Sequence, residues 1–416
     1  MEEKIATLLP RITSFLTVSA LLLAWFIRGA AAQGGSEARP ATNQSLHLVD
    51  PLTASAFDHF YNMDYDRAVQ EFQQVLDYHP DDPFAVNHLL TGVMFRELYR
   101  IGALNTADYS NDSFIGKIHQ DPDPKVKEQI KALVNRASKL EEKRLQTNRD
   151  DVEVLYARGV TRAQFATYTA LMERAWFSAL RNAVGARRDH ERVLELSPAY
   201  TDAKLIVGAH NYVMGSLPWA VKAAVSMVGL SGSKEKGLEY LRSAASGSGE
   251  TAVDAKILLA LFLRREHRFN EALEINHTLI PAYPGNVLLA LEEGNLQRGL
   301  GQNAAAATTY RKVWQAGKEG RYGPLHYEAA ALNLGDLLRS EKDYAGAANA
   351  YEQVAQIKQP DPEILQKADL GAGEMYDLLQ KRDLALKKYQ AVIASNAGSP
   401  PAEIARKYMK EPYRQD

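Results

Sequence analysis

Apolar residues recur along this chain at intervals of three and four positions. Within 253–265, for example, Ile257, Leu258, Leu261 and Phe262 fall at helical spacing. They form the apolar stripe of an amphipathic helix, because a strand would instead alternate apolar and polar residues at every second position. The pattern predicts an all-α protein.

A short motif returns four times between 253 and 392. Each copy has two small residues twelve positions apart, a larger side chain four positions later and an aliphatic one seven positions later. The small pairs are Ala260 and Ala272, Gly294 and Ala306, Gly335 and Ala347, and Gly373 and Ala385. The larger side chains are Asn276, Tyr310, Tyr351 and Tyr389, and the aliphatic ones are Leu279, Val313, Val354 and Val392. We predict four pairs of antiparallel helices, since Gly or Ala at a crossing lets two helix axes approach within about 8–10 Å.

This motif resembles the tetratricopeptide repeat, which has a period of about 34 residues, a small residue in the first helix and an Ala-x3-aromatic sequence in the second. Here Gly294 follows Ala260 by 34 positions, and Gly335 follows Gly294 by 41. The resemblance implies an α-solenoid, because one helix pair cannot bury its apolar face without stacking on its neighbours. It also implies that the first helix of each pair lines a concave groove that binds a protein or peptide.

Polar residues point outward from the first helices at the positions where such a groove would lie. We therefore predict that the following residues contact a partner: Arg264, Arg265, Asn295, Arg298 and Arg339. Arginine suits this task because its planar guanidinium donates two parallel hydrogen bonds to a carboxylate. The alternative is that these are solvated charges on helix faces.

Extending the motif towards the N-terminus gives eight repeats. The first is regular, with Ala56 and Ala68 twelve positions apart. In repeats two to four the small pairs are separated by 45, 27 and 29 positions; these pairs are Gly92 and Ala137, Gly159 and Ala186, and Gly208 and Gly237. We expect repeats one to four with insertions over 51–250, regular repeats five to eight over 251–398, and a polar C-terminal cap over 399–416.

The three insertions fall between first and second helices, so they should emerge on one edge of the solenoid. The first, 100–124, is loop-like and places the second helix of repeat two near Ile130; the second should lengthen both helices of repeat three. The third, 217–230, is apolar but too short to span a bilayer. One interpretation is that the insertions pack together, with Trp176 and Trp219 in the core. The other is that they bind a peptide or a membrane surface, with Tyr109 and Trp219 as contacts.

The N-terminal residues predict export. Lys4 and Arg11 precede an uncharged apolar run over 12–27, and three alanines end at Ala32. A basic start, an apolar run and a small-residue ending are typical of a signal peptide, here over 1–32, cleaved after Ala32. The alternative is an uncleaved inner-membrane anchor over 12–27, although a helix that spans the membrane usually needs about 20 apolar residues. Residues 33–50 read as a disordered leader. In a Gram-negative bacterium the repeats would lie in the periplasm or at the outer membrane.

Composition narrows the function. The formal net charge of −2 and pI near 6.6 give no basic domain of the kind that binds nucleic acid. The chain has no cysteine, which excludes disulfides, thiolate metal sites and cysteine nucleophiles. No HExxH or G-x-S-x-G sequence occurs, and His190 occupies the position that other repeats fill with an aromatic residue, so we predict that it is a packed core residue.

We therefore expect no enzyme, no metal and no cofactor, although a hydrolase with an unrecognised site is the remaining catalytic hypothesis. The function that the residues favour is a scaffold or adaptor in the bacterial cell envelope, binding a protein or peptide through the groove and the inserted edge of repeats two to four. The alternative is a lipid- or glycan-handling protein that uses the apolar insertion 217–230. Neither the partner nor the oligomeric state follows from the sequence.

Overall fold

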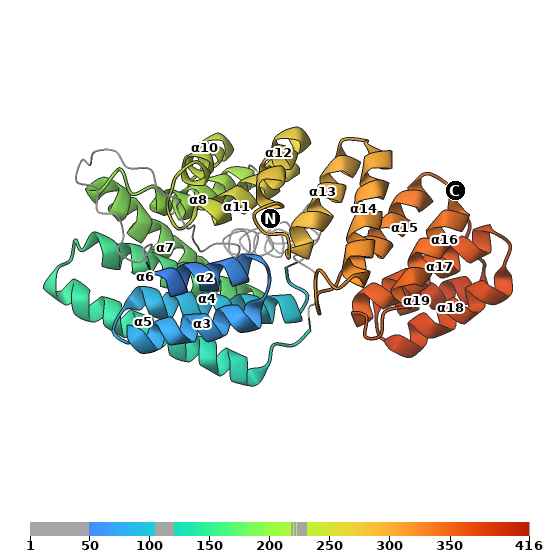
Figure 1. The fold of residues 1–416 in the computed structure, drawn as a ribbon, viewed down its shortest axis with the longest axis horizontal. Coiled ribbons are helices and arrows are strands. Elements are labelled where there is room, and N and C mark those ends of the chain that lie inside the picture. The colour runs from blue at the N-terminus through green and yellow to red at the C-terminus, as the bar shows by residue number, and fades with distance from the viewer. Residues whose placement is uncertain (1–49, 105–119, 218, 220–221, 223–230, 416) are drawn as a thin grey trace, which may run out of the picture. The chain divides into compact units, whose positions relative to one another are not determined.

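The computed structural model describes residues 50–104, 120–217, 219, 222 and 231–415 (Figure 1). Within these residues the secondary structure is helical, and successive helices pack as antiparallel pairs. The predicted all-α fold, a solenoid of the tetratricopeptide type, is confirmed. The predicted signal peptide or anchor, nearly all of the leader and Tyr109 lie outside the described residues.

The chain divides into two compact units, residues Met1–Arg268 and Phe269–Asp416. The N-terminal unit contains α2 (Pro51–Tyr61), α3 (Tyr65–Tyr78), α4 (Pro83–Arg100), α5 (Pro124–Thr147), α6 (Val152–Leu171), α7 (Trp176–Leu196), a 3-10 turn (Thr201–Ala203), α8 (Lys204–Ser216), α10 (Lys234–Ala245) and α11 (Ala252–Arg265). The C-terminal unit contains α12 (Phe269–Leu279), α13 (Val287–Gly299), α14 (Asn303–Lys318), α15 (Ala329–Ser340), α16 (Tyr344–Val354), α17 (Pro362–Leu378), α18 (Arg382–Ser395) and α19 (Pro400–Lys410).

Helices pair in chain order within each unit. In the N-terminal unit α2 packs on α3, α4 on α5, α6 on α7 and α8 on α10; in the C-terminal unit α13 packs on α14, α15 on α16 and α17 on α18. The helix α19 packs on α18 and α17, at the place predicted for the cap. The boundary between the units falls between α11 and α12, the two helices of the predicted fifth repeat.

Aspartate followed by proline begins several of the helices. Asp82 caps α4 by accepting a hydrogen bond from the backbone N–H of Phe84, and Asp123 caps α5 through Lys125. Proline is tolerated at the next position because the first N–H groups of a helix have no intrahelical partner. The prediction that the second helix of repeat two begins near Ile130 is therefore wrong, since the Asp-Pro pair starts α5 at Pro124.

A left-handed residue reverses the chain between the helices of several repeats. In repeat seven, Lys342 has a φ of 65°, and the next residue, Asp343, donates its N–H to the carbonyl of Leu338 at 2.9 Å. Met63, His267 and Gln380 have φ values of 63°, 57° and 60° at the corresponding turns. This geometry satisfies the last carbonyl groups of the first helix and lets the second helix begin almost at once.

The small residues of the motif lie directly on the rings of the second helix. A Cβ atom added to Gly335 would lie 2.4 Å from Cε1 of Tyr351, and one added to Gly294 would lie 2.4 Å from Cε1 of Tyr310. Tyr351 is 1% exposed, and its hydroxyl donates a hydrogen bond to Asp336 at 2.7 Å. The prediction that small residues sit where the paired helices cross is confirmed.

The insertion of repeat three lengthens both of its helices, as predicted: α6 has 20 residues and α7 has 21. Trp176 is only half-buried at the start of α7, and Trp219 is 84% exposed. The interpretation in which both tryptophans are core residues is therefore wrong. Most of the insertion 217–230 and residues 105–119 of the first insertion lie outside the described residues.

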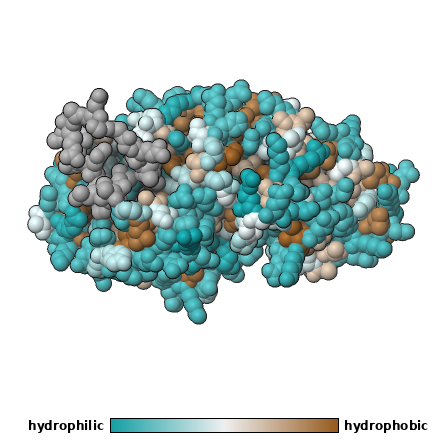
Figure 2. Space-filling view, viewed as in Figure 1, coloured by the Kyte–Doolittle hydropathy of each residue, from teal (hydrophilic) through white to brown (hydrophobic). Residues whose placement is uncertain are grey.

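The face shown in Figure 2 is mainly polar where the structure is described, with apolar residues in separate patches. In the described part of the chain, no helix combines the length and the apolar character needed to cross a membrane.

Candidate partner-binding surface

The first helices of the repeats in the C-terminal unit lie beside one another. The helix α15 contacts both α13 and α17, and α17 contacts α19. Three of the residues predicted to bind a partner, Asn295, Arg298 and Arg339, lie on α13 and α15. We call this face of α13, α15 and α17 the C-terminal surface.

Asn295 is engaged in contacts within the unit. Its side-chain oxygen accepts a hydrogen bond from the hydroxyl of Tyr310 at 2.8 Å and one from Asn333 at 3.5 Å. Its amide donates to Glu292 at 3.2 Å. Asn295 thus connects α13 to α14 and α15, and its first role is to hold neighbouring helices together.

Arg298 is exposed near the end of α13, and its guanidinium has no hydrogen bond or ion pair with the part of the chain that the structure describes. Burial raises the pKa of the nearby Asp336, and the Tyr351 hydroxyl and the positive charge of Arg298 oppose that rise. Arg298 is therefore available to a carboxylate on another molecule.

Arg339 is engaged on two sides. One guanidinium nitrogen, Nη1, pairs with Oε2 of Glu374 at 2.5 Å, and the other, Nη2, donates to the hydroxyl of Tyr413 at 2.9 Å. Burial raises the pKa of Glu374 to about 7, while Arg339 favours its charged form. The guanidinium also lies 5.3 Å from the centre of the Tyr413 ring, within the range of a cation–π contact.

Tyr413, the second partner of Arg339, lies in the segment after α19. Residues 411–415 follow α19 without helical structure, and the backbone N–H of Tyr413 donates to Oδ2 of Asp377 at 2.8 Å. The Tyr413 ring packs edge-on against Tyr408, with ring centres 5.1 Å apart, and Tyr344 donates to Gln415 at 2.8 Å. The C-terminal surface therefore holds an extended segment through both its backbone and its side chain.

Arg382 supports this arrangement from the start of α18. It pairs with both carboxylate oxygens of Asp377, at 2.8 and 2.9 Å, and donates to the carbonyl oxygens of Tyr408 and Met409. The Asp377 side chain is 1% exposed. Arg382 and Tyr389 thus hold the carboxylate that accepts the Tyr413 N–H. No repeat or motif predicts that segment 411–415 packs on this surface, since it contains one tyrosine among polar residues.

Arg264 and Arg265 lie in the last turn of α11, in the N-terminal unit, and both are half-buried. The predicted row of groove residues is therefore divided between the two compact units. Beside them, Glu266 accepts hydrogen bonds from Lys234 and Tyr212 at 2.7 and 2.8 Å, which ties the end of α11 to α8 and α10.

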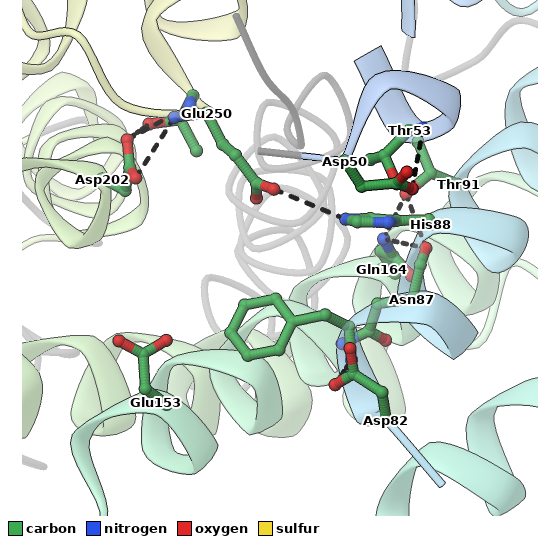
Figure 3. Close-up of polar contacts among 12 residues, drawn as sticks. Asp50, Thr53, Asp82, Asn87, His88, Thr91, Glu153, Gln164, Asp202 and Glu250 are labelled. Atoms are coloured by element: carbon green, nitrogen blue, oxygen red, sulfur yellow. Dashed lines mark hydrogen bonds and ion pairs between the residues drawn. The ribbon is translucent and has the colours of Figure 1, made fainter. Parts of the chain in front are cut away.

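Buried polar residues connect the first helices of the N-terminal unit (Figure 3). Asn87 on α4 donates to the carbonyl of Ala157 on α6 at 3.0 Å, and Gln164 donates back to the carbonyl of Asn87 at 3.2 Å. His88 points towards Glu250, with 3.6 Å between Nε2 and Oε1. This cluster joins α4, α6 and the segment before α11, and we assign it a structural role.

The remaining histidine candidate is also structural. His190 is fully buried, and its Nδ1 lies 2.8 Å from the carbonyl oxygen of Ala186, which fixes the proton on Nδ1. The ring packs on Gly159, where an added Cβ would lie 2.4 Å away, and on Tyr156 at 5.1 Å. The prediction that His190 is a packed core residue is confirmed. Among the described residues, no group of three or more histidines and carboxylates could hold a metal ion.

Comparisons with known proteins agree with this architecture. A family model described as tetratricopeptide repeat matches residues 60–82, which cover the end of α2, all of α3 and the turn that follows it. No curated protein sequence matches significantly.

Several solved structures are similar at low identity. A structure titled for the functional characterisation of pilF from Pseudomonas aeruginosa has 18% identity and a TM-score of 0.36, covering 60% of this chain and 97% of that one. The human IFIT1 dimer with a capped RNA has 13% identity and a TM-score of 0.40, covering 96% and 87%. The APC/C hetero-tetramer Cut9–Hcn1 has 12% identity and a TM-score of 0.45, covering 89% and 56%. The chain therefore contains a segment similar to the tetratricopeptide repeat, within a fold of stacked helix pairs.

Proposed function

We propose that this protein is a non-enzymatic scaffold that binds a partner protein by holding an extended peptide on the C-terminal surface. Tetratricopeptide repeat proteins generally mediate protein–protein interactions. The observation that carries the proposal is the tail segment 411–415, which lies on α15 and α17 with Tyr413 between Arg339 and Asp377.

The contacts of the tail describe the peptide that this surface fits. Asp377 accepts a backbone N–H, Arg339 donates to a hydroxyl and lies against a ring, and Arg298 is free to bind a carboxylate. A peptide with an aromatic residue and an acidic residue would satisfy all three groups. Such a peptide would displace Tyr413, so the tail would compete with the partner.

The proposed setting is the bacterial cell envelope, because residues 1–32 have the charge and apolar pattern of a signal peptide. N-terminal sequencing of the protein purified from its native host tests this step. A mature chain beginning at Gln33 supports export with cleavage, an intact apolar run in the membrane fraction supports the anchor over 12–27, and an intact chain in the cytosol contradicts export.

Site-specific photo-crosslinking in living cells tests the binding function. A photoreactive amino acid replaces Arg298 on the C-terminal surface, and in a control it replaces Lys312, which is exposed on α14. We expect a discrete protein adduct from position 298 only, with a higher yield when Tyr413→Ala removes the competing ring. Equal adducts from both positions, or none from position 298 in either background, would contradict the proposal.

The exposure of Trp219 favours a second candidate function, in which the insertion 217–230 contacts lipid or glycan. Flotation of the mature protein with liposomes tests it. Association that Trp219→Ala abolishes would support membrane contact, whereas protein that stays in the soluble fraction would leave peptide binding as the function.

A further inference from the structure

A groove lined by arginines crosses three helices of the N-terminal unit. Two adjoining cavities of about 670 and 550 Å³ form it, and both are lined by Arg162 on α6. The first is bounded by α5 and α6, and the second by α6 and α7. We call the pair of cavities the arginine groove; its cationic residues are Arg149, Arg158, Arg162, Arg181 and Arg188.

Only part of this positive charge is neutralised within the unit. Asp189 on α7 accepts hydrogen bonds from both Arg158 and Arg162, at 2.5 and 2.6 Å, so one carboxylate serves two guanidinium groups. Arg181 and Arg188 are exposed on α7, about two turns apart, and neither has an ion pair with any described residue. Arg149 is likewise exposed and unpaired within the described chain.

The floor of the groove contains a buried carboxyl group, one of whose oxygens lacks a hydrogen-bond partner in the described part of the chain. Glu141 on α5 is 0% exposed and lines the first cavity, and one of its oxygens accepts a hydrogen bond from Thr161 at 2.5 Å. The other oxygen, Oε2, has no hydrogen-bond partner in the described part of the chain. Burial raises the pKa of this carboxyl to about 7, which favours its neutral form. A buried polar group without a partner costs free energy, which a bound ligand would recover.

An apolar strip borders the arginines. Phe177, Leu180 and Val184 line the second cavity at helical spacing along α7, and Phe177 is 80% exposed. An exposed aromatic ring beside unpaired guanidinium groups is typical of an interaction surface. The ring supplies apolar contact area, and the arginines orient the partner through directional hydrogen bonds.

We propose that the arginine groove binds an acidic peptide segment of a partner protein, with carboxylates on Arg149, Arg181 and Arg188 and an apolar side chain on Phe177. The groove lies on the N-terminal unit and uses none of the residues of the C-terminal surface, so it is a separate site. A peptide fits better than a nucleic acid, because the aliphatic side chains of Leu180 and Val184 line the second cavity beside the arginines and match an apolar side chain, which a phosphate backbone lacks.

The test measures fluorescence anisotropy of a labelled peptide of about twelve residues that contains several glutamates, one phenylalanine and one leucine. A matched peptide with glutamine in place of glutamate and a single-stranded RNA of similar charge are measured alongside. The protein variant is Arg181→Glu with Arg188→Glu. Its matched control is Arg311→Glu with Arg321→Glu, two exposed arginines of the C-terminal unit that change the net charge equally.

We expect the groove variant to weaken binding of the acidic peptide at least about tenfold and the control variant to change it less than about twofold. Phe177→Ala should weaken binding by about threefold or more, since it removes apolar contact without changing charge. Circular dichroism confirms that each variant is folded.

Four outcomes would overturn the proposal. The first two are that the acidic peptide fails to bind, or that the glutamine peptide binds equally well. The third is an equal loss of affinity in the groove and control variants, which would indicate non-specific charge attraction. The fourth is an RNA that binds more tightly than the peptide with the same dependence on Arg181 and Arg188, which would make the groove a nucleic-acid site.

Discussion

At the scale of single residues, the helix pairs of the C-terminal unit depend on contact between a glycine and a tyrosine ring. An added Cβ would lie 2.4 Å from a ring atom at Gly294 and Gly335, and 2.6 Å at Gly373. Distances this short leave no room for a methyl group unless the ring moves, and the ring is held by its hydroxyl. In repeat seven that hydroxyl donates to Asp336 on the same helix as the glycine.

We therefore expect Gly335→Ala to lower the free energy of unfolding by about 1–3 kcal/mol. A loss of stability would be informative, because at an open helix position the same substitution stabilises a helix by about 1 kcal/mol. Urea unfolding followed by circular dichroism measures the change. Gly185→Ala is the control, since its nearest neighbour is the flexible side chain of Arg162 at 3.1 Å. A Gly335→Ala protein as stable as the wild type would show that the ring can move aside.

His190 gives the N-terminal unit a dependence on pH. Burial lowers its pKa to about 4, while the pKa of an unfolded histidine is about 6.5. Between these values the unfolded chain binds the proton and the folded chain does not, so stability falls as the pH falls through this window. His190→Phe places an aromatic residue there, like Phe72 in the first repeat, and should remove this contribution.

We expect the wild type to lose about 2 kcal/mol relative to His190→Phe between pH 7 and pH 4.5. The comparison of two proteins cancels the other titrating groups, among them Glu141, whose raised pKa acts in the opposite direction, and His210, whose pKa burial lowers to about 3. Urea midpoints at both pH values measure the difference. An equal loss in both proteins would assign the pH dependence to those other groups.

At the scale of elements, one left-handed residue sets the turn inside several of the described repeats. Lys342 occupies this position in repeat seven with a φ of 65°, whereas repeat six has Gly301 with a φ of 73°. A residue with a Cβ is strained in this region by about 1–2 kcal/mol, and glycine is not, although glycine loses more entropy on folding.

Lys342→Gly should therefore raise the free energy of unfolding by about 0.5–1 kcal/mol, and Lys342→Ala should not raise it. Thermal unfolding of the two variants and the wild type provides the measurement. Stabilisation by both substitutions would point to the lysine charge and away from the backbone as the cause.

The sequence predicted those elements whose packing repeats. Gly335 and Tyr351 recur at fixed spacing because each first helix must approach its second helix in the same way, so the periodicity reports the crossing directly. The start of α5 was missed because it depends on a local cap, Asp123 followed by Pro124, which can be placed anywhere in an insertion. The length of α6 and α7 was predictable because an apolar helical stripe continues through Phe165, Tyr168 and Met172.

At the scale of the whole molecule, the candidate sites were less predictable than the helices. Arg298 and Arg339 were predicted from their outward positions on helices. Only the structure shows that the Arg298 guanidinium has no partner in the described chain and that Arg339 pairs with Glu374 and Tyr413. Those partners are separated from Arg339 by 35 and 74 positions, and no periodicity connects them. The arginine groove was missed for the same reason, since its residues come from three helices and are brought together only by packing.

The division into two compact units predicts how a local defect spreads. In a repeat protein each helix pair is stabilised by its own contacts and by those with its neighbours, so a destabilised pair opens with its neighbours before distant pairs do. Gly335→Ala should therefore speed amide hydrogen exchange in α13 to α18 and leave α2 to α8 unchanged. Gly159→Ala, which would place a Cβ 2.4 Å from the His190 ring, should speed exchange in α4 to α8 and leave α15 to α18 unchanged. Hydrogen exchange measured by mass spectrometry on the intact chain reads both units in one experiment. If either substitution accelerated exchange equally throughout, the two units would unfold as one cooperative structure, and the boundary between α11 and α12 would have no energetic meaning.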